Sequence, residues 1–342
     1  MTASRFHDIA SCYSTLRIAV VGDFCLDRYL EIDPARQEIS IETGLPVYNV
    51  VNVRSQPGAA GTILNNLVAL GVAEIYPVGF CGEDGEGYAL RRSLLTRQGV
   101  KLDYFIETEL RHTFTYCKPL VMEPGKPPSE LNRLDSKNWT PTPALLQGRL
   151  IDSVARLANE VDAMIIMDQV DLPETGVVTA KLLEAIGEVV KELPELLILA
   201  DSRRGLRGYP PVCLKMNAAE LSALTGAKSA LTLDDIKRTA SALARQHERN
   251  VFVTLAELGI VGASPYMEAS HVPALPLRGE IDVVGAGDAV TANLTAALAG
   301  GATVCEAIAI ANAAASFVIH QLGTTGTASV AQIAELLPAS ES

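Results

Sequence analysis

Short apolar runs alternate with helix-length stretches along almost the whole chain, and this rhythm constrains the fold more than any other feature. The runs are brief and aliphatic, as fully buried strands are, and they lie at residues 17–22, 163–168, 196–201 and 250–255. Helical patterns lie between them, at residues 62–70, 85–98, 144–159, 174–192 and 233–247. Strands that are apolar throughout need cover on both faces. The sequence therefore predicts an α/β fold with a mostly parallel sheet between two layers of helices.

Two regions interrupt this rhythm. Residues 30–53 and 102–122 are rich in Thr, Tyr, Val and Ile at nearly alternating positions and show no helical period. We expect them to form a small antiparallel sheet outside the main one, as two insertions into one domain spanning residues 1–342. The length of 342 residues is also compatible with two domains, but the chain contains no flexible linker.

Charge and cysteine content exclude several classes of protein. The formal net charge is −12, which argues against nucleic acid or an anionic membrane as a partner because both need a basic face. A phosphorylated ligand remains compatible if local donors meet it. The cysteines show no Cys-x-x-Cys spacing and are expected to be reduced thiols; they are Cys12, Cys25, Cys81, Cys117, Cys213 and Cys305.

No segment of the sequence predicts secretion or membrane insertion. Residues 1–14 lack the basic and apolar regions of a secretory signal. The uncharged stretch 289–305 is interrupted by Gly300 and Gly301, and it is shorter than the roughly 20 apolar residues of a membrane span. We expect a buried core helix there and a cytoplasmic protein.

The sharpest chemical signal is the sequence Glu-Ile-Asp-Val-Val-Gly-Ala-Gly-Asp at residues 280–288, which opens that uncharged stretch. Gly285 and Gly287 permit a tight turn whose N–H groups, with that of Ala286, point one way at the start of a helix. Such an anion hole suits the charge that develops during phosphoryl transfer. Asp288 is placed to act as a base there, although an aspartate at this position can also simply cap the helix. The helix dipole should make it a weak base.

The common nucleotide-binding motifs are absent. Gly125-Lys126 is followed by Pro127, so no P-loop is present, and Val290 stands where a Rossmann fingerprint needs its third glycine. Neither a P-loop enzyme nor a dinucleotide enzyme is supported.

Three further segments carry weaker signals. Small residues at 57–62 open a helix and let a ligand approach the backbone, or they make a packing contact. Asp23 and Asp27 follow the first strand, where α/β sheets bind ligands, or they form a turn. Asn217 and Glu220 begin a helix, and a capping box explains them equally well.

Together and in this order, these segments resemble the PfkB (ribokinase-like) family of carbohydrate kinases. The shared pattern comprises Gly22-Asp23, the small-residue loop, Asn217-x-x-Glu220, Thr254-x4-Gly259 and the motif at 282–288, and it extends over about residues 17–333. Within the family, the chain is most similar to the kinase domain acting on D-glycero-D-manno-heptose 7-phosphate. The stretches that carry this similarity are 22–29, 39–42, 45–47, 133–135, 311–315 and 322–324. The nucleotidyltransferase domain that often follows this kinase is not expected here.

The resemblance implies a doubly wound α/β domain with a β lid, and it assigns roles to individual residues. Asp288 would be the catalytic base, with the amides of Gly285, Ala286 and Gly287 around the transferred group. The acceptor sugar would contact Asp27, Gly58, Ala59, Thr62, Asn66 and Arg133. ATP would contact Asn217, Glu220, Thr254, Glu257, Gly259 and Asn312. Mg²⁺ would lie on the phosphates with help from Glu220, a monovalent cation is left open, and pairing of lids between subunits implies a homodimer.

The acceptor side departs from the family pattern. Ala59 replaces the second loop glycine, Thr62 replaces an asparagine that contacts the sugar, and Tyr116 and Asp171 replace two lysines of the heptose kinase pattern. Losing lysines weakens binding of a phosphate. We therefore expect an altered acceptor, with heptose 7-phosphate a poor substrate.

The sequence thus predicts an ATP-dependent kinase for a hydroxyl of a sugar or sugar phosphate. Two alternatives stay open: a nucleoside kinase of the same fold, and a catalytically silent protein that binds a sugar or nucleotide.

Overall fold

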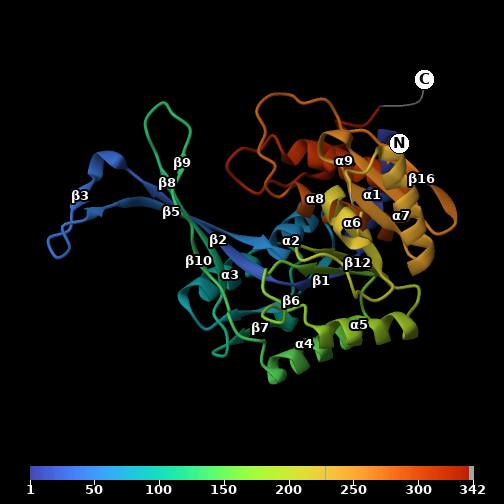
Figure 1. Cartoon of the computed structure of the whole chain (residues 1–342), viewed down its shortest axis with the longest axis horizontal. Helices are drawn as coiled ribbons and strands as arrows, with labels where there is room; N and C mark the ends of the chain where they lie inside the picture. The colour runs from blue at the N-terminus through green and yellow to red at the C-terminus, as the bar shows by residue number, and fades with distance from the viewer. Residues whose placement is uncertain (228, 339–342) are drawn as a thin grey trace.

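The computed structural model describes residues 1–227 and 229–338, and a nine-stranded sheet forms its centre (Figure 1). The strand order is β16-β15-β14-β13-β12-β11-β1-β6-β7. The strands are β1 (Arg17–Gly22), β6 (Glu74–Gly82), β7 (Phe105–Thr108), β11 (Ala163–Asp168), β12 (Leu197–Ser202), β13 (Cys213–Asn217), β14 (Val251–Thr254), β15 (Ile260–Ser264) and β16 (Met267–Val272). All neighbours from β7 to β14 are parallel, whereas β14, β15 and β16 pair antiparallel.

The order of this sheet reverses at β1. Its neighbours are β6 on one side and β11 on the other, and later strands extend the sheet beyond β11. Ligands of open α/β sheets bind outside the carboxyl ends of the strands at such a switch point. The carboxyl ends of β1, β11, β12, β13 and β14 therefore mark the expected site.

Helices cover both faces, as expected for a doubly wound fold. Alternate residues of β1 enter two separate cores: Ile18 and Val20 pack with α2, α8 and α9, whereas Ala19 and Val21 pack with α4, α5 and α7. The helices are α1 (Ala3–Ser11), α2 (Ala60–Ala69), α3 (Gly85–Leu95), α4 (Ala144–Leu157), α5 (Ala180–Glu192), α6 (Ala218–Thr225), α7 (Leu233–His247), α8 (Ala286–Ala299), α9 (Val304–Val318) and α10 (Val330–Ala334). Short 3₁₀ turns are η1 (Cys12–Thr15), η2 (Pro34–Arg36), η3 (Leu102–Tyr104) and η4 (Ala256–Leu258).

A second sheet stands away from the body of the molecule and forms the lid, seen at the left of Figure 1. Its order is β10-β8-β2-β5, with β9 paired to β8, and a small hairpin of β3 and β4 lies at its far end. These strands are β2 (Phe24–Ile32), β3 (Glu38–Ile39), β4 (Pro46–Val47), β5 (Val50–Ala59), β8 (Phe114–Val121), β9 (Ser129–Glu130) and β10 (Leu134–Ser136).

The lid differs from the expected insertions in extent and in pairing. It begins earlier, at Phe24, and also includes residues 134–136, whereas Phe105–Thr108 of the second expected insertion is strand β7 of the main sheet. An exposed edge strand of a parallel sheet shows the same alternation as a lid strand, so the pattern does not separate the two. The lid is also not purely antiparallel, because β2 and β8 run parallel.

The structure shortens one predicted helix and confirms the buried core helix. The helix predicted over 174–192 begins only at Ala180, because Thr179 caps it and the preceding residues form a loop. The uncharged stretch after Asp288 forms α8, which is buried almost all round. In the described ranges, 1–227 and 229–338, none of the helices is both long and apolar enough to span a bilayer.

Candidate active site

A cavity of about 500 Å³ lies at the carboxyl ends of the central strands, between the main sheet and the lid. It collects side chains from both sheets, from the loop before α8 and from the starts of α2 and α6. Its lining residues are Cys25, Asp27, Ala59, Thr62, Tyr116, Lys118, Arg133, Lys137, Gln169, Asp171, Asp201, Arg203, Lys215, Asn217, Glu220, Thr254, Val283, Val284, Gly285, Gly287, Asp288 and Thr325.

The turn before α8 has the geometry that its glycines suggest. Gly285 adopts a left-handed conformation with φ of 84° at the helix N-cap, which costs a residue with a side chain free energy. A Cβ at Gly287 would lie 3.2 Å from the Nζ of Lys215. The turn thus brings backbone amides, a helix N-terminus and a lysine together beside Asp288, as an anion-stabilising site requires.

Asp288 is buried in the first turn of α8, and its pKa is raised to about 7. Burial is the main cause, and the charge of Asp201 adds to it, whereas Arg203 and Lys215 act in the opposite direction. The expectation that the helix dipole makes Asp288 a weak base is therefore wrong. Loss of hydration on burial disfavours the charged carboxylate, and a base whose pKa lies near neutrality suits proton abstraction at physiological pH.

A buried network supports this end of the cavity. Lys215 Nζ and Thr291 Oγ1 donate to the same oxygen of Asp201, at 2.8 and 2.9 Å. Sequence reasoning did not find Asp201 or Lys215 as site residues. One signal was present: Lys215 is a charged residue between the apolar residues Leu214 and Met216 of strand β13, and a buried charge in a strand requires a partner.

Strand β2 brings Asp27 into the cavity, and the junction of β5 and α2, called the acceptor loop below (residues 57–62), brings Ala59 and Thr62. Burial raises the pKa of Asp27, while Lys118 and Arg133 oppose the shift. Gly58 does not line the cavity but is required beside it, because a Cβ there would lie 2.5 Å from Asp27 Oδ2. Ala59 adopts φ 54° and ψ −117°, a conformation that is costly for any residue other than glycine.

Asn66 is not a cavity residue, contrary to the expectation. It is fully buried behind the wall, where its Nδ2 donates to the carbonyl of Thr62 at 3.0 Å. A second carbonyl, that of Gly326, lies 3.5 Å from the same nitrogen. It lies one turn further along the same face of α2 as Thr62, deeper than the cavity wall, where its amide supports the backbone at Thr62 and Gly326.

The residues expected to hold the nucleotide fall into three groups. Asn217, Glu220 and Thr254 line the main cavity. The first two also form a complete capping box, in which the Glu220 carboxylate accepts from the N–H of Asn217 at 2.7 Å. Glu257 and Gly259 lie outside the cavity around the turn η4, and Gly259, with φ of 91°, packs against backbone of residues 272–274.

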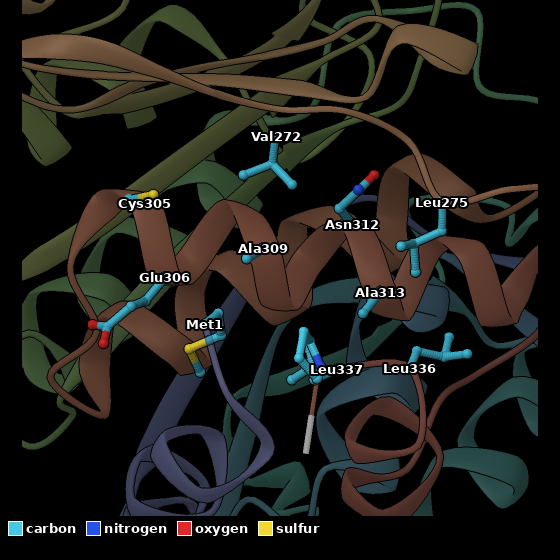
Figure 2. A pocket seen from close by; sticks show the side chains of 11 residues that line it. Met1, Val272, Leu275, Cys305, Glu306, Ala309, Asn312, Ala313, Leu336 and Leu337 are labelled. Carbon is cyan, nitrogen blue, oxygen red and sulfur yellow. The ribbon is translucent and has the colours of Figure 1, made fainter. Parts of the chain in front are cut away.

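Asn312 lies apart from the main cavity. Its side chain lines a smaller, mainly apolar cavity of about 240 Å³ with α9, Val272, Leu275, Met1 and the segment around Leu336 (Figure 2). Its Nδ2 donates to the carbonyl of Pro273 at 2.7 Å. The amide therefore ties α9 to the backbone that follows β16.

The two aspartates after β1 have different roles. Asp27 lines the cavity, whereas Asp23 is buried and accepts backbone N–H groups from Gln169, Val170 and Val177 at 2.9, 3.2 and 2.7 Å. Burial and the nearby Asp168 raise the pKa of Asp23 to about 6 despite these donors. Asp23 thus holds the loop that carries Gln169 to the cavity wall.

The comparisons with known proteins agree with this geometry. The model for the pfkB family carbohydrate kinases matches residues 16–331. The chain belongs to this family. As a pfkB-family protein it is a member of a group of phosphotransferases with alcohol acceptors, which confirms the family and the enzyme class expected from the sequence.

Two curated relatives match most of this pfkB-family chain. It is 32% identical over 308 residues to Bifunctional protein HldE of Azorhizobium caulinodans, covering 90% of this chain and 61% of that protein. The HldE of Gluconobacter oxydans is 30% identical over 313 residues, with 90% and 62% covered. The chain therefore spans less than two thirds of the length of these relatives.

Solved structures share the fold. Arabidopsis thaliana ribokinase complexed with ribose and ATP matches with a TM-score of 0.68 at 20% identity, covering 94% of this chain and 98% of that one. Phosphofructokinase-2 from Escherichia coli, in complex with substrates and products, matches with a TM-score of 0.69 at 18% identity, covering 94% and 97%. These similarities confirm the ribokinase-like fold.

Proposed function

We propose that this protein transfers the γ-phosphoryl group of ATP to a hydroxyl of a sugar or sugar phosphate, with Asp288 as the base. The observation that carries the proposal is the buried carboxylate of Asp288, whose pKa is raised to about 7, at a glycine-rich helix N-terminus. This carboxylate shares one cavity with the acceptor residue Asp27 and with Asn217 and Glu220.

Within that cavity, each residue has a separate role in the proposed reaction. Asp288 takes the proton from the acceptor hydroxyl as it attacks the γ-phosphorus, and the leaving group departs as ADP. The amides of residues 285–288 and the ammonium of Lys215 stabilise the charge on the transferred phosphoryl group. Asp27 accepts hydrogen bonds from acceptor hydroxyls, and the lid excludes water that would otherwise hydrolyse ATP.

The residues present fit ATP-bound Mg²⁺ better than a resident metal. Among residues 1–227 and 229–338, no group of three His, Cys, Asp or Glu side chains could hold an ion. Mg²⁺ usually binds through the phosphates and a few waters, with few protein ligands. Glu220 would contact it through water, since its carboxylate also caps α6. When bound, the ion would neutralise phosphate charge. A monovalent cation requirement is left open.

We keep the prediction that D-glycero-D-manno-heptose 7-phosphate is a poor substrate, because Thr62 lines the cavity where the family pattern has an asparagine. One premise changes: Asp171 does not face an acceptor phosphate unpaired, because Lys137 lies 2.7 Å from it. Asp171 therefore repels a phosphorylated acceptor less strongly than an unpaired aspartate would.

The experiment that tests the kinase is ATP consumption with a panel of sugars, sugar phosphates and nucleosides. We expect turnover with at least one sugar or sugar phosphate and a lower specificity constant for the heptose phosphate than for that acceptor. Turnover with nucleosides alone would favour a nucleoside kinase. Binding of acceptors and ATP without turnover in any combination would favour the silent binding protein.

We also propose that two lids pair in a homodimer. The arm from β3 to β5 exposes seven large apolar side chains, and β5 is an unpaired edge of the lid sheet. These side chains are Ile39, Ile41, Leu45, Tyr48, Val50, Val51 and Val53. Sedimentation should show a dimer that Ile41→Lys/Val51→Lys converts to a monomer, and a wild-type monomer at micromolar concentration contradicts the idea.

A further inference from the structure

A side-chain bridge joins the lid to the loop between α9 and α10 (residues 319–329, the α9–α10 loop below). Gln56 lies in lid strand β5, and its Nε2 donates to Thr325 Oγ1 at 2.7 Å. Its Oε1 accepts from Thr324 Oγ1 at 3.2 Å. The same nitrogen lies 3.5 Å from the hydroxyl of Tyr29 within the lid, so its shorter hydrogen bond is the one that leaves the lid. One carboxamide thus uses both its donor and its acceptor on two consecutive threonines.

The α9–α10 loop in turn contacts the turn before α8. A Cβ at Gly285 would lie 3.2 Å from the Cβ of Thr325, so the loop leaves little room for a side chain there. Asp282 adds two hydrogen bonds, because its carboxylate accepts from the N–H of Gly323 at 3.2 Å and its own N–H donates to the carbonyl of Ile319 at 2.7 Å. The loop therefore supports the turn that presents backbone amides at the start of α8.

At its other end, the bridge begins beside the proposed acceptor contact. Gln56 lies directly opposite Asp27 in the antiparallel pairing of β5 with β2. Such opposite residues project from the same face of a sheet, with Cβ atoms about 4.5–5.5 Å apart. Asp27 lines the cavity. A continuous path of contacts thus runs from the acceptor side of the lid, through Gln56 and the α9–α10 loop, to the turn before α8.

Two other side-chain bridges leave the lid but end elsewhere. Arg28 pairs with Glu86 of α3 at 2.7 Å, and Lys137 pairs with Asp171 in the loop after β11 at 2.7 Å. Both are partly solvated ion pairs, which contribute little stability. Gln56 differs because its partners belong to the segment that contacts the turn before α8.

We propose that Gln56 is a positioning residue that couples the lid to the transfer site. Its hydrogen bonds to Thr324 and Thr325 hold the α9–α10 loop against Gly285, so the amides and Asp288 keep their working geometry only while the lid is in place. A misplacement of about 1 Å at a transfer site costs on the order of 10²-fold in rate, so a weak bridge has a large effect on turnover. This inference rests on the proposed kinase function and adds a control of that same site. Gln56 takes no proton and binds no phosphate.

The first test is steady-state kinetics of Gln56→Met, which keeps the length of the side chain and removes both hydrogen bonds. We expect kcat to fall roughly 10-fold to 100-fold because the transfer site is misaligned. The KM for ATP should stay nearly unchanged, since Asn217 and Glu220 do not depend on the bridge. A raised KM for the acceptor with an unchanged kcat would instead show a role in binding alone and overturn the proposal.

A double-mutant cycle tests whether the effect passes through the threonine. Thr325→Val keeps the shape of the side chain and removes its hydroxyl. Because Gln56→Met and Thr325→Val break the same hydrogen bond, the double variant should lose no more kcat than Gln56→Met alone. Losses that multiply would mean independent effects and contradict the coupling. Asn52→Leu is the matched control on β5, because Asn52 donates to Glu31 at 3.0 Å within the lid, and its kcat should equal that of the wild type.

Hydrogen–deuterium exchange gives a readout that needs no turnover. Gln56→Met should speed the exchange of amides at residues 319–329 and 283–287, because opening of both segments becomes easier without the bridge; Asn52→Leu should change neither. Unchanged exchange at residues 283–287 in Gln56→Met overturns the inference, even if kcat falls. Faster exchange in a protein that phosphorylates no acceptor of the panel supports the coupling and overturns the kinase.

Discussion

The two ends of the cavity are built in different ways. At the transfer end, Asp288, Asp201 and Lys215 are all buried, and the last two satisfy each other at 2.8 Å. At the acceptor end, the side chains of Arg133, beside lid strand β10, and of Asp171, in the loop after β11, are 46% and 76% exposed. A buried network tolerates little change, because each member leaves an unpaired charge when removed. A solvated wall can exchange one charge for another, so specificity can change while the chemistry is kept.

The strongest test of this contrast is Asp288→Asn. If Asp288 is the base, this variant should keep ATP binding nearly unchanged and lose roughly 10²–10⁴-fold in kcat, the usual contribution of a positioned base. Steady-state kinetics with the best acceptor of the panel measure it, with nucleotide affinity as the control. Nearly full activity would remove Asp288 from the mechanism.

The second test concerns the stability of the transfer end. Lys215→Met leaves the carboxylate of Asp201 buried without its cation, and breaking such a pair costs about 3–5 kcal/mol of unfolding free energy. Lys101→Met, at an exposed position, should cost far less. Chemical denaturation of both variants gives the comparison. Similar losses of unfolding free energy in the two variants would mean that the buried pair stabilises the fold no more than an exposed lysine does.

A pH profile tests the base directly. Since burial raises the pKa of Asp288 to about 7, kcat/KM should fall about tenfold per unit below pH 7 and level off above it.

The free energy of unfolding should change with pH in the opposite direction. The folded pKa lies above the unfolded value of about 4, so ionising Asp288 costs stability as pH rises from about 4 to about 7. In Asp288→Asn this part of both pH dependences should disappear; a profile centred near pH 4 contradicts the assignment.

The smallest expected effect concerns the acceptor loop. Ala59→Gly should raise the unfolding free energy by about 1 kcal/mol, because glycine adopts φ 54° and ψ −117° with less strain. Ala60→Gly, one residue later in the first turn of α2, should instead lower it by a similar amount. Thermal melting compares the pair. A loss of stability in both would show that Ala59 is not strained.

Local patterns predicted the parts of the site that lie together in the chain. Residues 285–288 were identified because turn, helix start and carboxylate are consecutive, and the strands at 17–22 and 163–168 end where the structure ends them. Lys215 and Lys137 were missed because only the sheet order brings them to the cavity. Asn66 was expected in the cavity because it shares a face of α2 with Thr62, but spacing does not tell how far along the helix the cavity extends. Asn312 lies on α9 beside a second cavity, a placement that depends on tertiary packing and that the sequence pattern does not predict.

The connection between the two sheets has a consequence for how this protein can change over time. Only Asp23 separates β1 from β2. A Cβ at Gly22 would lie 2.2 Å from the carbonyl oxygen of Met167, so the backbone at this junction is closely packed. Adding or deleting one residue would exchange the faces of β2. Asp27 would then trade sides with Arg28, which now pairs with Glu86 at 2.7 Å. The lid can therefore diversify by point substitution, whereas a change of length at its root would turn the acceptor wall outward.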